Sequence, residues 1–508
     1  MQKNNIIHNI QTAYDNKNYE NALQQIEDTI KFITFDFYYR EPVQSTQKFD
    51  SICHKIGQST LIKTPNPHYN TETIVYIASE LYLTGGHTLC LKSFIDAQPN
   101  KKHIILLTAQ NKKDINKLKK VRFSSKNTTI FCYENSSKKI MPRIKWLQKK
   151  LLEIRPFHCF LFNHPYDTSI IAATQPYLAN QFYLYHHSDC SPNIGLNLDH
   201  INVISIFEYE YWRLSQFISL KRLCFIPLMF PESKTPIKYN LKKEDKIISA
   251  SSTADKYKIQ LPYHYTFEDS VIKLLKKTKG THILIGDFPA SIIINIIKKI
   301  SQFGLSKKNL IHIPWVPNLG NSLEELNVTL YLTTTPSVGG LTLTEVMSKG
   351  IPIIKHSCYT SKKLRMSDLT YPEAYIWKNN SEFDTILSQL NYEILKKHHK
   401  FSINHFNKTH NQNHLSLYLN KEKIIGKKID LKTLNTTIHI QNDQNNQNEL
   451  LIYLDRLDHE HIRIKKENLL ITYINNTKNK LKKYYIHLIY IIKYKNQTTT
   501  IQKTINKL

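Results

Sequence analysis

Closely spaced cysteines are missing from this sequence. Its 508 residues include seven cysteines, and none of them forms a C-x-x-C pattern with another. Disulfide frameworks and zinc ribbons both depend on paired cysteines, so the sequence excludes these two classes. Isolated cysteines are typical of a protein that works in a reducing compartment.

Long apolar runs are missing too. A transmembrane helix needs roughly 20 consecutive apolar residues, whereas the longest candidate here, 484–492, is shorter and contains His487. The first residues also lead into no apolar segment of the kind that a signal peptide requires. We therefore expect a cytoplasmic protein that is at most peripheral to the inner face of the membrane.

Acidic residues are too few to balance the basic ones. The chain has 69 Lys and Arg against 41 Asp and Glu, which gives a formal net charge of +28. Such a charge attracts phosphates, nucleic acids or anionic membranes without choosing among them. No recognisable RNA- or DNA-binding module accompanies it, so we expect no specific nucleic-acid partner.

Helical periodicity is the first pattern that the chain does show. Ala13, Tyr19, Ala22, Leu23 and Ile26 recur at the spacing of one helix face. Strand signals are missing from the same part of the chain. We predict a helical N-terminal cap over residues 1–65.

From Thr73 onward, short apolar segments alternate with helical ones. This alternation is typical of parallel α/β sheets, and it predicts two Rossmann-like domains, over 66–228 and 229–400. The proline-rich stretch 225–239 suits a linker between them. Two such domains place a ligand site in a cleft outside the carboxyl ends of the strands. The expected strands are 74–78, 103–107, 129–132, 157–162, 182–185, 200–206, near Ile247, 282–286, 310–313, 328–332 and 351–355.

Residues 401–508 have a different texture. Asn- and Gln-rich runs separate segments of alternating hydrophobicity, such as 436–440 and 469–474, which predicts a β-rich accessory region. Residues 471–508 carry eight Lys and no Asp or Glu. A charge run of this kind is either a solvated face or a contact surface for an anionic membrane or an accessory protein, and both readings stay open.

One segment carries more chemistry than the others. A strand ending at Leu332 leads to the paired glycines Gly339 and Gly340, and a helix follows that ends before Gly350. Paired glycines at a strand-to-helix turn let backbone N–H groups approach an anion, and the helix N-terminus adds partial positive charge. We expect the diphosphate of a sugar nucleotide to bind at this turn.

Four further short sequence motifs occur along the chain, and their order and spacing matter for the comparison that follows. They are YLTGGHT at 82–88, YHHSDCSPNIG at 185–195, DKYKI at 255–259, and IPWVP at 313–317 followed by the glycine turn. Together they resemble the GT-B glycosyltransferases. More narrowly, they are similar to the inverting group that contains O-GlcNAc transferase and the bacterial cytoplasmic protein glucosyltransferases that modify adhesins. The resemblance covers about residues 74–355. It implies an α/β fold of two Rossmann-like domains facing a cleft, a nucleotide sugar (UDP-linked) as co-substrate, and no other cofactor.

The resemblance also implies a set of donor-binding residues. Lys258, with Lys256 second, would neutralise the diphosphate, although either lysine taken alone could be a solvated surface charge. Trp315 would stack on the base, or else belong to the core. The glycine turn, which includes Gly339 and Gly340, would be the phosphate floor. The remaining candidate contacts to phosphate, sugar and ribose are Thr342, Thr344 and Glu345, and either threonine could instead be a helix cap.

Retaining GT-B enzymes have a second Glu eight positions before the one at the place of Glu345. In this chain that earlier position is Ser337. The departure favours inversion of configuration.

Inversion needs a group that accepts the proton of the attacking hydroxyl. His186, His187 and Asp189 follow an expected strand on the acceptor side, and His87 follows the turn Gly85–Gly86. A histidine pKa near 6.5 makes any of the three suitable, but a structural hydrogen-bonding role is equally open to each. The His-His-x-Asp cluster has no third ligand at suitable spacing, so we expect no metal site.

These observations predict a glycosyltransferase that moves a hexose from a nucleoside-diphosphate sugar to a protein side chain or a cell-envelope glycan. Inversion without a metal is the expected chemistry. One alternative is a retaining or lipid-linked GT-B transferase at a membrane surface, where each Lys of the basic tail contributes roughly 1 kcal/mol near anionic lipid. The other is a nucleic-acid-binding protein with a degenerate transferase core, whose binding would fall steeply with salt.

Overall fold

The computed structural model describes residues 5–35, 46–61, 68–83, 85–134, 139–187, 192–231, 245–253, 257–260, 265–357, 369–419, 423–424 and 426–431. The chain divides into two compact units, Met1–Asn9 with Gln447–Leu508, and Ile10–Asn446. Everything described below, apart from the first residues of one helix, belongs to the second unit.

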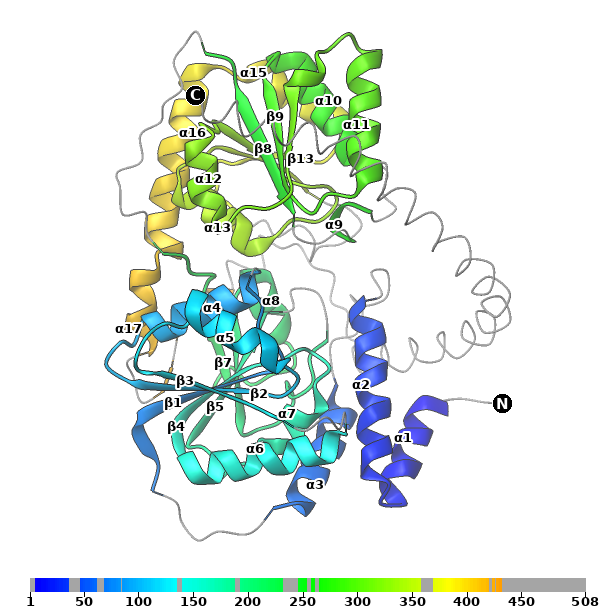
Figure 1. The fold of residues 1–508 in the computed structure, drawn as a ribbon, viewed down its shortest axis with the longest axis vertical. Coiled ribbons are helices and arrows are strands. Elements are labelled where there is room, and N and C mark those ends of the chain that lie inside the picture. Colours follow the sequence, from blue (N-terminus) through cyan, green and yellow to red (C-terminus); the bar gives the residue numbers. More distant parts are fainter. Residues whose placement is uncertain are drawn as a thin grey trace. The chain divides into compact units, whose positions relative to one another are not determined.

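Seven parallel strands form the first sheet, in the order β3-β2-β1-β4-β5-β6-β7. The six strands that the sequence predicts here are all present, and β7 is the one it missed, since three residues are too short for a pattern. Figure 1 draws α4 and α5 on one side of this sheet and α6 on the other, which explains why the strands are apolar on both faces. The elements are β1 (Asn70–Ala78), α4 (Gly86–Asp96), β2 (Lys102–Leu107), α5 (Lys112–Val121), β3 (Thr128–Cys132), α6 (Ile140–Ile154), β4 (Pro156–Phe162), α7 (Thr168–Ala173), β5 (Gln181–His186), β6 (Ile201–Ser205), α8 (Glu208–Leu214) and β7 (Leu223–Phe225).

Six parallel strands form the second sheet, in the order β10-β9-β8-β11-β12-β13. The five predicted strands are present, and the short β13 was missed. The sequence also predicts one helix near 381–397, and this is wrong: two helices occur, because Asn391 caps the second one through the N–H of Ile394. The elements are β8 (Ile248–Thr253), α9 (Tyr257–Gln260), α10 (Phe267–Thr278), β9 (Thr281–Gly286), α11 (Ala290–Gln302), β10 (Leu310–Ile313), α12 (Leu319–Glu325), β11 (Leu330–Leu332), α13 (Gly340–Ser348), β12 (Ile353–His356), β13 (Tyr375–Trp377), α15 (Asn380–Gln389) and α16 (Tyr392–His405).

Both sheets reverse their strand order at one point. In the first sheet the reversal lies between β1 and β4, and in the second it lies between β8 and β11. Loops that leave such neighbouring strands in opposite directions open a crevice at the carboxyl ends of the strands, where α/β folds bind ligands. The loops after these four strands are therefore the ones to search for a site.

The N-terminal helices are α1 (Asn5–Asp15), α2 (Tyr19–Phe35) and α3 (Gln47–Ser59). Of these, α2 contacts α6 and α7, and α3 contacts α7. Glu20 of α2 accepts hydrogen bonds from the backbone N–H groups of Ile140 and Met141, at 2.6 and 2.9 Å. A carboxylate at a helix N-terminus compensates the unsatisfied N–H groups there, so α2 caps α6.

The chain after the second sheet returns to the first. A π-helical turn (Phe406–His410), a 3-10 turn (Gln412–His414) and α17 (Leu415–Leu419) follow α16. The carbonyl of Leu419 accepts a hydrogen bond from Gln98, and the N–H of Ile424 donates to the hydroxyl of Tyr183. The described part of 401–431 contains helices and two isolated bridges, Phe225 with Gly426 and Phe230 with Asn411. The alternating segments that predict a β-rich region, such as 436–440 and 469–474, lie outside the described residues, so that expectation stays a prediction. The basic stretch from 432 to 508 lies outside the described residues.

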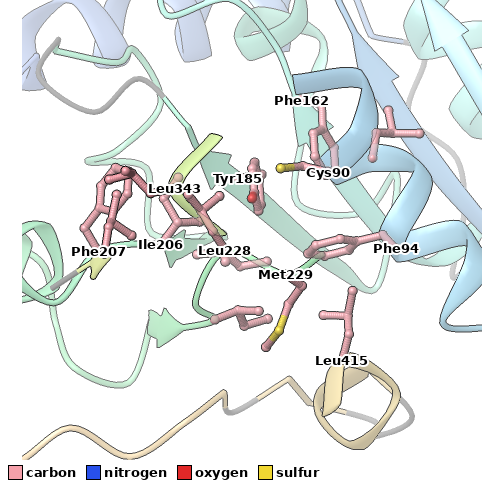
Figure 2. Packing of buried hydrophobic residues seen from close by; sticks show 14 of the residues in the cluster. Cys90, Phe94, Phe162, Tyr185, Ile206, Phe207, Leu228, Met229, Leu343 and Leu415 are labelled. Carbon is pink, nitrogen blue, oxygen red and sulfur yellow. The ribbon is translucent and has the colours of Figure 1, made fainter. Parts of the chain in front are cut away.

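One apolar cluster contains residues from the layers around both sheets. Figure 2 shows Leu343 of α13 together with Phe207 and Leu228, which follow β6 and β7, and Leu415 of α17 facing Met229. The glycine-turn helix is thus held by side chains that follow strands of the first sheet. In the part of the chain that the structure describes, no helix is long and apolar enough to cross a membrane.

Candidate functional site

The donor-side turn brings a cation over uncapped backbone N–H groups. Gly339 occupies the N-cap position of α13, and no side chain of the residues that the structure describes caps this helix. An idealised Cβ placed on Gly339 would lie 3.5 Å from Nζ of Lys258 and 2.9 Å from Oγ1 of Thr342. The N–H of Ser337 donates to the carbonyl of Lys258 at 3.4 Å, which ties α9 to the turn. A lysine ammonium, a hydroxyl and a helix N-terminus therefore converge at the switch point of the second sheet, which is an arrangement suited to phosphate.

The two glycine turns also approach each other. A Cβ on Gly86, the first residue of α4, would lie 3.3 Å from Cβ of Leu341 in the first turn of α13. A Cβ on Gly340 would meet Cδ1 of Leu228 at 2.9 Å and Cδ1 of Leu369 at 3.1 Å. Both glycines are thus required for close packing, whereas Gly85 is required for its backbone, with φ of 114°.

Thr344 and Glu345 have partners within the protein. The hydroxyl of Thr344 is buried and donates to the carbonyl of Leu341 at 2.8 Å, so neither this threonine nor Thr342 caps the helix. The carboxylate of Glu345 accepts the N–H of Gly320, at the start of α12, at 2.8 Å. Burial raises the pKa of Glu345, and the backbone N–H groups at α12 partly oppose this shift.

The remaining donor candidates have different surroundings. Trp315 lies in the loop between β10 and α12 and is 60% exposed, so the alternative of a core aromatic is wrong. Lys256, like Asp189 on the acceptor side, lies outside the described residues.

His87 and His187 form a pair at the carboxyl edge of the first sheet. Their ring centroids are 4.3 Å apart, and His87 also contacts the carbonyl of Phe162 through Nε2 at 2.8 Å. Burial, together with the nearby His164, lowers the pKa of His87 to about 4. Burial and His87 lower the pKa of His187 well below its usual value. Both imidazoles are therefore neutral at pH 7, and the same burial disfavours the protonated form that a general base must adopt, which corrects the pKa near 6.5 expected from the sequence.

His186 does not join this pair. It is buried at the end of β5, and its Nε2 lies 2.8 Å from Oε1 of Glu210, which is in turn ion-paired with Arg213. Successive residues of a strand point to opposite faces, so His186 faces α8 while His187 faces the edge. The prediction that His186 is a catalytic candidate is corrected accordingly, because its ring lies within a buried ion-pair network.

Sequence reasoning missed four polar residues at the same edge. Glu80 and Tyr82 follow β1, and His164 and Tyr166 follow β4. The hydroxyl of Tyr82 donates to Glu80 at 2.5 Å, and the rings of His164 and Tyr166 are 5.3 Å apart. Their positions in the sequence could have identified them, because each follows one of the two strands between which the strand order reverses. Among the described residues, no group of three or more His, Cys, Asp or Glu is arranged to hold a metal ion.

The comparisons with known proteins agree on the fold. No family model matches the chain, and no curated protein matches it by sequence. A structure of S. aureus TarM in complex with fondaparinux, α-GlcNAc-glycerol and UDP is similar, with a TM-score of 0.51 and 13% identity, over 69% of this chain and 99% of that one. At this identity the likeness shows the fold alone, which is of the GT-B type.

Two further matches are more distant. The lipopolysaccharide outer core galactosyltransferase WaaB gives a TM-score of 0.48 at 13% identity, over 69% of this chain and 100% of that one. An O-GlcNAc transferase variant from Thermobaculum terrenum gives 0.44 at 10% identity, over 81% of each chain. Neither match supports an argument about the narrower inverting group, which stays a prediction from the sequence.

Proposed function

We propose that this protein is a glycosyltransferase that moves a hexose from a UDP-sugar to an acceptor hydroxyl. The observation that carries the proposal is the position of the Lys258 ammonium beside Gly339, at the uncapped N-terminus of α13. This point lies at the switch point of a GT-B-type fold, where a diphosphate is best accommodated. The UDP in the TarM complex supports the choice of nucleotide.

The reaction needs charge compensation on the departing side. The acceptor oxygen forms a bond to the anomeric carbon, and the bond between that carbon and the β-phosphate oxygen breaks. Its electron pair leaves with UDP, so negative charge grows on the diphosphate. Lys258 and the N–H groups of α13 stabilise that charge, because fixed donors and cations act most strongly where charge develops. Gly339 leaves room for the phosphate beside Lys258, Gly340 lets the start of α13 pack closely on Leu228 and Leu369, and Thr342 supplies a hydroxyl.

The acceptor hydroxyl must also lose its proton. His187 and His87 are half-buried and neutral at the edge of the first sheet. Either ring nitrogen that is free of a backbone contact can accept the proton as the new bond forms. We propose His187 as the base, with His87 stacked beside it as an orienting group.

The proposed stereochemical outcome is inversion. Ser337 stands where retaining GT-B enzymes have a Glu, and its side chain is buried. A neutral Ser offers no carboxylate to a sugar cation. NMR of the first-formed product checks this assignment, and a product with the anomeric configuration of the donor would contradict it.

We propose a division of labour along the chain that follows the sequence boundaries. Residues 66–228 would bind the acceptor, 229–400 the nucleotide sugar, and 1–65 would support the acceptor side. The acceptor would be a protein side chain or a cell-envelope glycan. The basic region 401–508 would contact an anionic membrane or an accessory protein.

Calorimetric titration with UDP, GDP, CDP and ADP at two salt concentrations tests the function. We expect saturable binding of UDP that survives the higher salt, and loss of that binding in Lys258→Ala. Lys308→Ala, an exposed lysine of the same domain, is the control. Absence of nucleotide binding, together with salt-sensitive binding of RNA, would contradict the proposal and favour the nucleic-acid alternative.

A further inference from the structure

The acceptor edge of the first sheet carries a carboxylate where the protein as a whole is strongly basic. Glu80 is half-buried two residues after β1, and its Oε2 accepts the hydroxyl of Tyr82 at 2.5 Å. Its other oxygen accepts no hydrogen bond from the residues that the structure describes. Tyr82 is 47% exposed, so the carboxylate and the aromatic ring are both accessible at this edge.

The loop that carries Glu80 and Tyr82 is held in place by its neighbours. The N–H of Leu81 donates to Gln110 at 2.7 Å, and the N–H of Tyr82 donates to Thr88 at 2.9 Å. Arg122 donates to the carbonyl of Leu83 at 2.8 Å. A loop anchored at successive residues presents its side chains in one arrangement, which lowers the entropic cost of binding a ligand.

A second aromatic group continues the same surface. Tyr166 and His164 follow β4, and the ammonium of Lys31 on α2 lies 5.4 Å from the centre of the Tyr166 ring. His164 interacts electrostatically with Glu80 on one side and with both His87 and His187 on the other. The carboxylate, the two tyrosines and the histidine pair therefore follow neighbouring strands at the same edge of the sheet and lie close enough to act on one another electrostatically.

Charges of both signs lie around this surface. Burial, together with Glu80, Asp167 and Glu27, raises the pKa of Tyr166 to about 12, and the pKa of Glu27 is itself raised to about 7 by burial. Arg143 acts on Asp167 and Glu27 and offsets them, and Lys31 is the cation that acts on His164. Glu80 thus remains as the carboxylate nearest the exposed Tyr82, and it would repel a phosphate or a carboxylate on the ligand.

We propose that Glu80 and Tyr82 select a neutral, hydroxyl-rich acceptor, namely an unphosphorylated glycan, and that Glu80 orients the attacking hydroxyl toward the histidine pair. This inference rests on the proposed glycosyl transfer and names the acceptor class of that same site. A sugar ring offers hydroxyl donors to the free carboxylate oxygen and an apolar face to the tyrosine ring. A carboxylate that accepts a hydroxyl makes a charge-assisted hydrogen bond, which is stronger than a neutral one.

The test measures UDP release from a UDP-hexose with matched acceptor pairs. The pairs are glucose and glucose 6-phosphate, galactose and galactose 6-phosphate, and glycerol and glycerol 3-phosphate, with a mixture of Ser- and Thr-containing peptides as a further arm. We expect the neutral member of each productive pair to be used at least ~tenfold better than the phosphorylated one. Equal use of the phosphorylated member, or faster release with the peptides, would overturn the proposal.

Variants separate this proposal from the proposed function. Glu80→Gln should lower kcat/KM for the neutral acceptor by about tenfold. It should also reduce the ratio of kcat/KM between the neutral and the phosphorylated acceptor, while UDP affinity is unchanged. Glu325→Gln, an exposed glutamate on α12, should change none of these values. Tyr82→Phe, which removes the hydrogen bond to Glu80 and keeps the ring, should raise KM without altering UDP affinity, and it covers the case in which Glu80→Gln is unstable.

The outcomes are distinguishable. If UDP binds and no sugar of any pair raises its release above the rate in buffer, the acceptor assignment fails while the nucleotide site stands. If the discrimination in Glu80→Gln equals that of the native chain, the role of Glu80 is overturned. Loss of UDP binding in the native chain would instead contradict the glycosyltransferase proposal itself.

Discussion

The carboxyl edges of the two sheets are built by different means. In the second sheet the candidate site consists of backbone N–H groups at the start of α13, one hydroxyl and one ammonium, from Lys258. In the first sheet it consists of side chains that come from several loops, with His87 and His187 paired at 4.3 Å and Glu80 on the loop after β1. Backbone donors fit any diphosphate, whereas a set of side chains fits one kind of acceptor. Under the proposed function, the donor would be recognised by its phosphates and the acceptor by its hydroxyls.

The largest expected effect comes from Gly340→Val. A Cβ at this position already lies 2.9 Å from Leu228 and 3.1 Å from Leu369, and valine adds two methyl groups. Because closely packed side chains can move only a little, the start of α13 must shift. The proposed phosphate site at this helix N-terminus would shift with it. We expect calorimetry to show at least ~100-fold weaker UDP binding. Circular dichroism serves as the folding control, and unchanged affinity would mean that the phosphate site lies elsewhere.

Lys258→Ala removes the cation from the donor edge and leaves its backbone intact. We expect kcat to fall by ~100-fold or more, since removal of one group that stabilises developing charge has an effect of that order. The melting temperature should stay the same, because the lysine is partly exposed. Lys258→Arg should recover part of the rate, and activity close to that of the native chain in Lys258→Ala would exclude this residue from the mechanism.

Substitutions at the neighbouring residues His186 and His187 should have different effects on activity and on stability. His187→Gln should lower kcat by ~100-fold, the effect of losing a general base, with little change in the free energy of unfolding. His186→Gln should do the opposite and destabilise the fold by about 2 kcal/mol, because it removes the buried imidazole that lies 2.8 Å from Glu210 while the pair of Glu210 with Arg213 remains. Urea denaturation and steady-state kinetics on both variants check this. Similar losses of activity at equal stability would contradict it.

A buried histidine of the second sheet predicts a pH dependence of stability. His282 is fully buried on β9, and burial lowers its pKa from 6.5 to about 3. The buried neutral ring adds to the free energy of unfolding in full above pH 6.5. This stabilisation is lost as the pH falls toward 3, because in that range the unfolded chain binds a proton at His282 and the folded chain does not. The loss is about 1.4 kcal/mol per pH unit. Urea denaturation from pH 7.5 to 5 should show that the free energy of unfolding falls less steeply with decreasing pH in His282→Gln than in the native chain. The same slope in both proteins would contradict the assignment.

The smallest effect is expected for Trp315→Ala. The side chain is 60% exposed on the loop after β10, so its removal opens no cavity. If it stacks on the uracil ring, UDP affinity should fall by ~10-fold, as the loss of one aromatic stacking contact would produce. Titration with UDP and with inorganic diphosphate separates base from phosphate binding. Equal losses for both ligands would exclude stacking.

The local patterns of the sequence predicted most of the fold. Continuous apolar segments marked eleven of the thirteen strands, and the two that were missed, β7 and β13, have three residues each. The helix that was wrongly continued past Leu390 depends on one capping bond from Asn391 to Ile394. Asparagine is a preferred N-cap residue, so Asn391 was a local signal for the start of a second helix.

The sequence by itself determined the alternating α/β order and the glycine turn before α13, because periodicity and paired glycines are properties of contiguous residues. Only the tertiary structure decided which side chains meet. It placed Lys258 over Gly339 across the switch point of the second sheet, and Leu341 against Gly86. It also turned His187 toward the acceptor edge and His186 into the buried ion pairs, because consecutive strand residues face opposite sides and what each side holds is set by strand order and by the helices packed on it.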